Sequence, residues 1–168
     1  VLVCGPVNLK THHPAIRRVD VESAAQMYEV TSREFANSDV AVLSAAVADF
    51  TPKEKADHKI KRGKDDLVLE LLPTKDIAAE LGKMKNASQL LVGFALETND
   101  EEVNALSKMQ RKNLDMIVLN SLNDKGAGFG VDTNKVTIMD KAGNRTVYEL
   151  KTKLEVAKDI VDQIASRL

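Results

Sequence analysis

Small and acidic residues follow one of the apolar runs in this sequence, a combination that suits the binding of a nucleotide. The segment Ser44–Phe50, SAAVADF, begins with small side chains that let a ligand approach the backbone closely. A closely crossing helix explains Ala45 and Ala46 equally well. Asp49 is harder to explain as a helix cap, because Pro52 and a cluster of charges follow it. We therefore expect a ligand to contact this segment.

The next segment, Lys53–Lys64, is strongly basic, with six Lys or Arg residues against two acidic ones. Dense like charges usually mark a solvated surface, and this is the simpler interpretation of any one lysine. Within the segment, Ile60 lies between Lys59 and Lys61. In an extended chain the isoleucine would anchor the segment while both lysines reach the other way. Such a loop could close over an anionic ligand and bring a lysine to its phosphates.

An aromatic ring and an expected helix start come together in Gly93–Thr98, GFALET. The ring of Phe94 could stack on a flat base, and a helix N-terminus attracts anions through its free amides and dipole. Packing in the core explains a phenylalanine more simply. The segment is therefore a candidate for nucleotide binding that has an ordinary structural alternative.

Three cations, Lys108, Arg111 and Lys112, fall within one turn of the helix expected next. Like charges at this spacing destabilise a helix by roughly a few tenths of a kcal/mol each, so a bound anion would offset their repulsion. A solvated basic face is the alternative. Asn120, after the run DMIVL, either contacts an amide or ribose or closes a turn.

The sequence lacks the motifs of several common chemistries, among them GxGxxG, GxxxxGK[ST], CxxC, HExxH and GxSxG. Its three histidines, His12, His13 and His58, are too dispersed to predict a metal triad. We assign no metal ligand to the protein itself. Phosphates would be bound by scattered amides and lysines, with Mg²⁺ held by the substrate.

Alternating strands and helices must position these residues. Apolar runs predict strands at Val1–Cys4, Asp39–Val47, Leu67–Leu72, Gln89–Ala95 and Asp115–Leu119. Because strands and helices alternate, we expect an α/β, Rossmann-like domain of three layers with a mainly parallel sheet. In such sheets ligands bind beyond the carboxyl ends of the strands, where the candidate residues lie.

Helix starts are expected at Asp20, at Thr74, and at the capping boxes Thr98–Glu101 and Thr152–Glu155. A hairpin with a turn at Gly143 precedes the last helix. That helix carries an apolar stripe formed by Leu154, Ala157, Val161, Ile164 and Leu168.

Composition favours one soluble domain over residues 1–168, with 43% hydrophobic and 4% aromatic residues and a net charge of −1. No apolar run reaches the about 18 residues of a membrane span, and no signal peptide is present, so we expect neither membrane nor secretion. The single Cys4 fits a reducing compartment, and we expect the cytoplasm. The near-zero charge argues against a nucleic-acid binder. The chain opens inside an apolar run without Met, which predicts missing upstream sequence.

Several segments together resemble the phosphopantothenoylcysteine synthetase (phosphopantothenate-cysteine ligase) family. The resemblance covers nearly the whole chain and rests on order and spacing. Its segments are VCGPVNL (3–9), SAAVADFTPKEKADHKIKR (44–62), TKDI (74–77), GFALET (93–98) and KMQRKNLDMIVLN (108–120). It implies a ligase that activates 4'-phosphopantothenate with CTP and Mg²⁺ as an acyl-cytidylate, from which the amine of cysteine displaces CMP.

The resemblance also implies residue roles. Lys59 is similar to the catalytic lysine of a mobile flap, and Ala45 and Ala46 match backbone that lines the substrate and nucleotide sites, beside Ser44. The remaining nucleotide residues implied by the family pattern are Asp49, Asp76, Ile77, Phe94, Lys108 and Lys112. Thr74 and Lys75 replace the usual Asn-Pro, which puts that contact in doubt.

Other family features are expectations of the same kind. The family's glycine-rich segment and first strand are not present in this sequence. Members form homodimers, for which the hairpin at Gly143 and the strand Leu67–Leu72 are candidate interfaces. In bacteria the ligase is commonly fused to a flavin-dependent decarboxylase, so FMN is expected only on that separate domain.

Two other function classes stay open on the sequence. One is a non-catalytic nucleotide-binding or oligomerisation domain. The other is an NAD(P)-dependent oxidoreductase, which the fold allows but the absent glycine fingerprint and the lysine-rich loop disfavour. Lys59→Ala discriminates among them, because only the ligase needs that side chain.

Overall fold

The computed structural model describes residues 1–62, 66–121, 123, 126–127 and 130–168. They group into two compact units, Val1–Glu34 with Ala45–Ile77 and Phe35–Ser44 with Ala78–Leu168. The expectation of a single domain over residues 1–168 remains a prediction. Each unit has its own sheets, and each is described separately below.

The second unit is built on a five-stranded sheet in the order β10-β9-β7-β6-β3. β3 pairs with β6 and β6 with β7 in parallel, whereas β9 and β10 are antiparallel to their neighbours. The strands are β3 (Val40–Leu43), β6 (Leu90–Glu97), β7 (Met116–Ser121), β9 (Val136–Asp140) and β10 (Arg145–Val147). Together with the parallel pair β1 and β2 of the first unit, this confirms the expected α/β fold with a mainly parallel sheet and a C-terminal hairpin.

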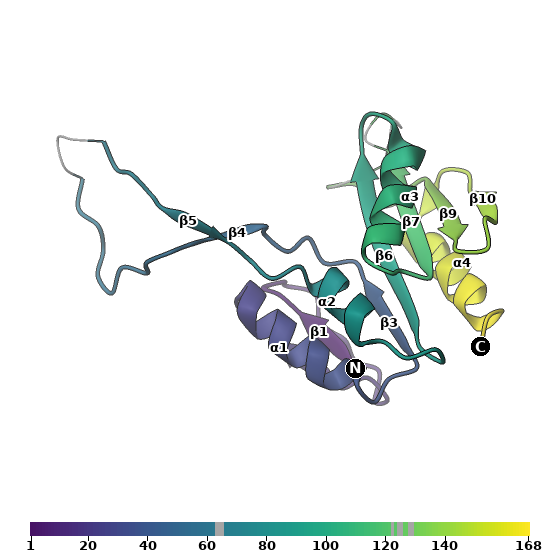
Figure 1. Cartoon of the computed structure of the whole chain (residues 1–168), viewed down its shortest axis with the longest axis horizontal. Helices are drawn as coiled ribbons and strands as arrows, with labels where there is room; N and C mark the ends of the chain where they lie inside the picture. Colours follow the sequence, from purple (N-terminus) through teal and green to yellow (C-terminus); the bar gives the residue numbers. More distant parts are fainter. Residues whose placement is uncertain (63–65, 122, 124–125, 128–129) are drawn as a thin grey trace. The chain divides into compact units, whose positions relative to one another are not determined.

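Helices cover both faces of this sheet, α3 on one and α4 on the other (Figure 1). α3 (Glu101–Arg111) buries Ala105 and Met109, and α4 (Lys153–Ala165) buries Val156, Ile160 and Ile164. The α4 residues form one core cluster with strand residues such as Val92, Met116 and Val118. Each fully buried aliphatic side chain contributes roughly 1.5–3 kcal/mol, so these two interfaces hold the three layers together.

The apolar stripe predicted on α4 is wrong. Leu154, Val161 and Leu168 are 69%, 60% and 74% exposed, and of the predicted stripe only Ile164 is buried. The helix carries a second apolar stripe, and its start decides which one faces the sheet. Thr152 pairs with Thr133 in the small sheet of β11 (Lys151–Thr152) and β8 (Thr133–Asn134), and it also forms the predicted capping box with Glu155.

The capping box predicted at Thr98 is also wrong. β6 continues through Glu97, and α3 begins at Glu101 after Asp100, which has a left-handed backbone with φ 46° and no side-chain cap bond. The helix thus starts later than predicted, with Asp100 at the position that the prediction gave to Thr98. The Thr98 carbonyl instead accepts a hydrogen bond from Asn123 Nδ2 at 2.8 Å.

α2 spans Ile77–Met84, so the helix start predicted at Thr74 is displaced by three residues. The Thr74 hydroxyl donates to the Ala48 carbonyl at 2.6 Å and does not cap the helix. Leu81 is fully buried, whereas Met84 at the end of the helix is 50% exposed.

In the first unit, β1 (Leu2–Cys4) and β2 (Arg18–Asp20) form a parallel pair, and α1 spans Ala24–Phe35. Asp20 is therefore a strand residue paired with Cys4, and the helix start predicted there is wrong. Ser23 Oγ accepts from the Gln26 amide at 3.2 Å, next to the observed start.

β4 (Phe50–Pro52) pairs antiparallel with β5 (Leu71–Pro73). The predicted strand Leu67–Leu72 is thus largely wrong, because its partner offers only three residues and 67–70 lie beyond the pairing. Of the residues between these two strands, the described ones, 53–62 and 66–70, form neither helix nor strand (Figure 1). No helix in the described part of the chain is long and apolar enough to cross a membrane.

Candidate functional site

A lysine and a carboxylate meet at the carboxyl end of β6. Lys108 Nζ donates to Glu97 Oε1 at 3.0 Å, and the side chains are 26% and 21% exposed. Lys108 lies two turns into α3, about 10 Å along the helix axis. Because helix side chains point toward the N-terminus, its ammonium returns to the strand end where ligands of α/β sheets bind.

A polar network fixes the elements around this pair. Ser121, the last residue of β7, is the Cα partner of Glu97 and donates to Glu101 Oε1 at 2.5 Å. Asn123 Nδ2 donates to the same carboxylate at 2.9 Å and to the Thr98 carbonyl at 2.8 Å. The end of β7 is thereby tied to the start of α3.

Asn120 lies one residue earlier in β7, and its Oδ1 accepts from Nδ2 of the buried Asn134 at 3.1 Å. This contact holds Asn120 in a side-chain pair between β7 and β8. The contact between Asn120 and an amide or ribose therefore remains a prediction.

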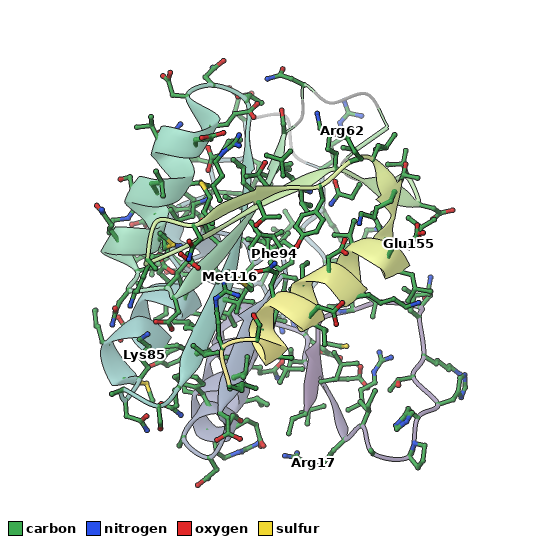
Figure 2. All side chains as sticks on the ribbon, turned by 90° about the vertical axis from the view of Figure 1, so that its right-hand side faces the viewer. Arg17, Arg62, Lys85, Phe94, Met116 and Glu155 are labelled. Atoms are coloured by element: carbon green, nitrogen blue, oxygen red, sulfur yellow. The ribbon has the colours of Figure 1, made fainter. Side chains whose placement is uncertain are left out.

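Phe94 faces the other side of the sheet. Side chains alternate along a strand, so Phe94 shares a face with Val92, and Glu97 lies on the opposite face. The ring is partly buried and packs against the core cluster to which α4 contributes, and Figure 2 shows it near Met116 beneath that helix. Phe94 therefore packs in the core, and a contact with cytosine stays a prediction.

Lys112 caps the C-terminus of α3, with its amide donating to the Lys108 carbonyl at 3.0 Å. Its backbone is packed closely against α2. A Cβ at Gly82 would lie 1.9 Å from the Lys112 carbonyl oxygen, so only glycine allows this approach. Lys108 and Lys112 belong to one helix end, as the sequence predicts, and both are half-buried.

In the first unit, two of the predicted segments come together. The Thr74 amide donates to the Asp49 carbonyl at 2.8 Å, next to the Thr74 hydroxyl bond to Ala48. The structure thus joins the start of TKDI to the end of SAAVADF. Asp49 and Asp76 are exposed, whereas Ile77 is buried at 8% exposure.

The small residues Ser44, Ala45 and Ala46 follow β3 and are exposed. Ala45 and Ala46 belong to the first unit with Asp49 and Asp76, and Ser44 belongs to the second with Phe94, Lys108 and Lys112. Their exposed backbone is accessible to a ligand, as the first interpretation of the sequence requires.

Lys59 is exposed in the segment between β4 and β5, which has no regular structure there. Ile60 is 56% exposed, so the prediction that it anchors the segment is not met within this chain. The end of the basic segment, Gly63 and Lys64, lies outside the described residues. The exposed, irregular chain leaves Lys59 accessible to an anion.

Sequence reasoning missed Glu97, Glu101, Ser121 and Asn123. Glu97 and Ser121 lie just beyond an apolar run, which is the signal that singled out Asp49 and Asn120. The run to Ala95 hid Glu97, because β6 extends two residues further than predicted.

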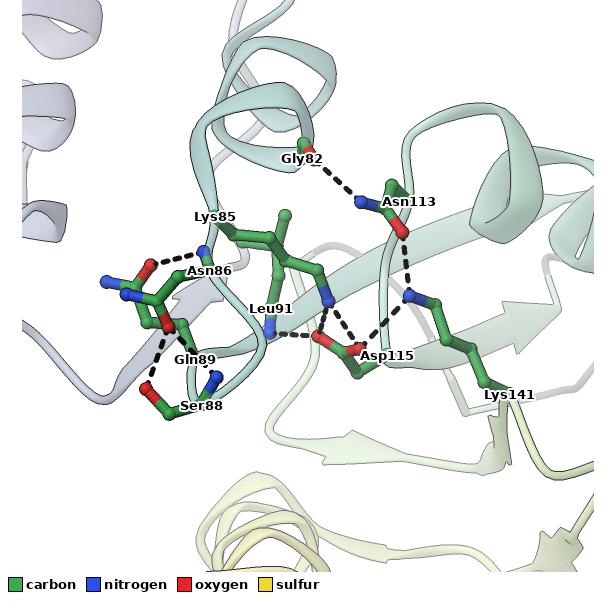
Figure 3. Close-up of polar contacts among 9 residues, drawn as sticks. All are labelled: Gly82, Lys85, Asn86, Ser88, Gln89, Leu91, Asn113, Asp115 and Lys141. Atoms are coloured by element: carbon green, nitrogen blue, oxygen red, sulfur yellow. Dashed lines mark hydrogen bonds and ion pairs between the residues drawn. The ribbon is translucent and has the colours of Figure 1, made fainter.

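A second polar cluster lies at the other end of the same strands (Figure 3). Asp115, just before β7, accepts from Lys85 Nζ at 2.5 Å and from the Leu91 amide at 2.7 Å, and pairs with Lys141 at 3.1 Å. Lys141 also donates to Asn113 Oδ1 at 2.7 Å. The cluster therefore ties α2, the end of α3 and the β9–β10 turn to the start of the sheet.

The charged groups of this cluster shift one another's pKa values. Burial alone would raise the pKa of Asp115, but the hydrogen bonds from Lys85, Leu91 and Lys141 hold the pKa below its usual value. Burial lowers the pKa of the Lys85 ammonium, and Asp115 opposes that shift. Lys85 is only 9% exposed, so the cluster is a structural ion pair.

Within the described ranges, no group of three or more His, Cys, Asp or Glu side chains is placed to hold a metal ion.

Comparisons with known proteins identify the family of the chain. The family model described as the DNA/pantothenate metabolism flavoprotein C-terminal domain matches residues 1–168. A protein of an unknown prokaryotic organism, named cysteine/cysteine sulfinic acid decarboxylase, is 60% identical over 163 residues, which are 97% of this chain and 45% of that protein. The coenzyme A biosynthesis bifunctional protein CoaBC of Bacillus subtilis is 45% identical over 166 residues, covering 99% of this chain and 41% of that protein.

A solved structure is similar as well. The crystal structure of the C-terminal domain of a coenzyme A biosynthesis bifunctional protein CoaBC matches with a TM-score of 0.79 and 39% identity, over 97% of this chain and 71% of that chain. The chain thus spans less than half the length of the two curated relatives.

Proposed function

Because the chain belongs to the DNA/pantothenate metabolism flavoprotein C-terminal domain family, we propose that it joins 4'-phosphopantothenate to L-cysteine with CTP. The observation that carries the proposal is the similarity of nearly the whole chain to CoaBC proteins, whose name places them in coenzyme A biosynthesis. The exposed, basic and polar residues beyond the strands give that activity a physical basis.

The reaction has two steps. A carboxylate oxygen of phosphopantothenate attacks the α-phosphorus of CTP, and the bond to pyrophosphate breaks as the new O–P bond forms. The cysteine amine then attacks the acyl carbon, CMP leaves with the electron pair of the broken C–O bond, and the amine loses a proton. Negative charge builds up on the phosphates in the first step, so cations have the largest effect there.

Lysines supply those cations in the proposal. Lys59, on its exposed segment, neutralises the departing pyrophosphate, and Lys108 and Lys112 face the triphosphate. Ammonium groups on long stems suit this work, because they carry charge to phosphates without a fixed geometry. Mg²⁺ would arrive with the nucleotide, bound to its phosphates.

The remaining residues bind and orient. Asp49 contacts the nucleotide, as do Asp76 and Ile77 in the segment that is hydrogen-bonded to it. Phe94 lies beside the cytosine. The exposed segment from Ser44 to Ala46 lines the sites of phosphopantothenate and of the nucleotide. In the same proposal the protein is a cytoplasmic homodimer, and FMN belongs to a separate decarboxylase domain.

The relative named a cysteine/cysteine sulfinic acid decarboxylase favours a second candidate, because it is 60% identical to this chain. This segment would then be a non-catalytic domain that binds nucleotide or mediates oligomerisation beside a decarboxylase. The match covers 45% of that relative, so its name alone does not locate the decarboxylation in this segment.

The deciding experiment measures CTP-dependent pyrophosphate release with phosphopantothenate, cysteine and Mg²⁺, using the complete natural protein. Lys59→Ala should lower kcat by about 10²-fold or more if Lys59 stabilises the leaving phosphate. Lys55→Ala, a matched change in the same exposed segment, should leave kcat within about twofold. No pyrophosphate release by the folded protein would reject the ligase and leave the non-catalytic domain.

A further inference from the structure

Glu97 is a carboxylate placed where a triphosphate would bind, and its charge has the wrong sign for that ligand. It lies at the carboxyl end of β6, on the face of the sheet that carries α3. Its Oε1 accepts from Lys108 Nζ at 3.0 Å, and the two side chains remain 21% and 26% exposed. Attraction of the nucleotide therefore does not explain why a carboxylate lies at this position.

The geometry gives that reason. A lysine has four rotatable side-chain bonds, so an ammonium without a partner samples many positions and loses entropy when a ligand fixes it. Lys108 starts two turns down α3 and reaches the strand end only when its chain is extended toward the helix N-terminus. The bond to Glu97 selects that extended form.

Glu97 itself is held in place. Its Cα pairs with Ser121 across the sheet, and Ser121 donates to Glu101 at the start of α3. The backbone of Glu97 is therefore fixed relative to the helix that carries Lys108. A rigid acceptor of this kind can set the position of a flexible donor.

We propose that Glu97 is a positioning residue, which holds the Lys108 ammonium at the carboxyl end of β6 ready for the nucleotide phosphates. This inference rests on the proposed function, and it adds to it a residue that acts through Lys108. The ion pair is neutral as a unit, so the benefit is placement of the ammonium and not extra positive charge.

The sign of the effect separates placement from simple electrostatics. Glu97→Gln keeps the size of the side chain and removes its negative charge. If Glu97 mattered only through repulsion of the phosphates, the variant would bind CTP more tightly. If it positions Lys108, the variant binds CTP more weakly, although the site has become more positive.

The test uses the complete natural protein with Glu97→Gln, Lys108→Gln and the double variant, and measures CTP binding by calorimetry together with KM and kcat. Glu97→Gln should weaken CTP binding and raise its KM about tenfold, the size of one hydrogen bond between charged groups. The KM values for phosphopantothenate and cysteine should not move. In the Lys108→Gln background, Glu97→Gln should have no further effect on CTP, because the group it positions is gone.

Glu102→Gln is the matched control, since Glu102 lies on the same helix and pairs with Arg145 instead of Lys108. It should leave CTP binding unchanged. Thermal unfolding of each variant checks that the fold is intact.

Two results would overturn the proposal. One is tighter CTP binding by Glu97→Gln, and the other is an equal loss of affinity in the presence and absence of Lys108, which would mark a general structural role. The protein could show no turnover and still bind CTP or tripolyphosphate in a way that depends on Glu97. That result would support the positioning role of Glu97 and reject the ligase proposal. No binding of either by the natural protein would overturn both.

Discussion

Lys85 with Asp115 at the amino ends of β6 and β7, and Lys108 with Glu97 at the carboxyl end of β6, are both lysine–carboxylate pairs. Their surroundings differ. Asp115 also accepts from the Leu91 amide and pairs with Lys141, and Lys85 is only 9% exposed. At the other end both partners are more than a fifth exposed. The same chemistry is enclosed as a structural tie at one edge and left open to a ligand at the other.

Asp115→Ala should have the largest effect on stability. It leaves the Lys85 ammonium buried without its carboxylate and the Leu91 amide without its acceptor. Breaking a buried pair in this way costs about 3–5 kcal/mol. Urea denaturation measures the free energy of unfolding, and Asp115→Asn, which keeps an acceptor oxygen, should lose less. A loss below about 1 kcal/mol for the alanine variant would contradict the structural interpretation of this end.

Acidification should weaken the same end more gently, because a protonated Asp115 still accepts one hydrogen bond. The pKa of Asp115 is lowered in the folded protein, so its contribution to stability is complete above the ordinary Asp value of about 3.9. That contribution is lost as the pH falls through the lowered folded pKa. Unfolding free energy measured against pH should fall more steeply for the natural protein than for Asp115→Asn. Parallel curves would show that Asp115 is not the group responsible.

Glu97→Gln should change stability little, by about 1 kcal/mol or less, because both partners of its ion pair are partly solvated. The comparison with Asp115→Asn in the same urea experiment is the informative one. If the two variants lost equal stability, the contrast between the ends of the sheet would disappear.

The smallest effect is expected for Glu102→Gln, within about 0.5 kcal/mol. Glu102 and Arg145 are 47% and 48% exposed, so solvent already screens their attraction. Thermal unfolding at low and high salt should give the same difference between variant and natural protein within error. A strong salt dependence would mean that exposed pairs matter more to this fold than the comparison assumes.

The sequence predicted which strands and helices form better than it predicted where they begin and end. Apolar runs located β6 and β7 because strands buried on both faces have few alternatives. The α3 start failed because Thr98 and Glu101 match a capping box that the longer β6 does not allow. The face of α4 failed because two apolar stripes compete on that helix, and tertiary contacts at Thr152 choose between them.

The candidate site was predictable to a similar degree. Small residues after a strand singled out Asp49, and the spacing of cations within one helix turn singled out Lys108 and Lys112. The pairing of Glu97 with Lys108 was not predictable, because it depends on how α3 packs back on β6. The hydrogen bond between Thr74 and Ala48 joins residues 26 positions apart, and no local pattern signals it.

Gly82 shows what such close packing means for anyone who wishes to engineer this protein. It lies inside α2, where glycine costs roughly 1 kcal/mol relative to alanine, and yet a methyl group there would overlap the Lys112 carbonyl. In a library of random substitutions, Gly82 should tolerate no replacement, because every other residue adds a Cβ at this position. Any library of variants of this protein should therefore leave Gly82 unchanged.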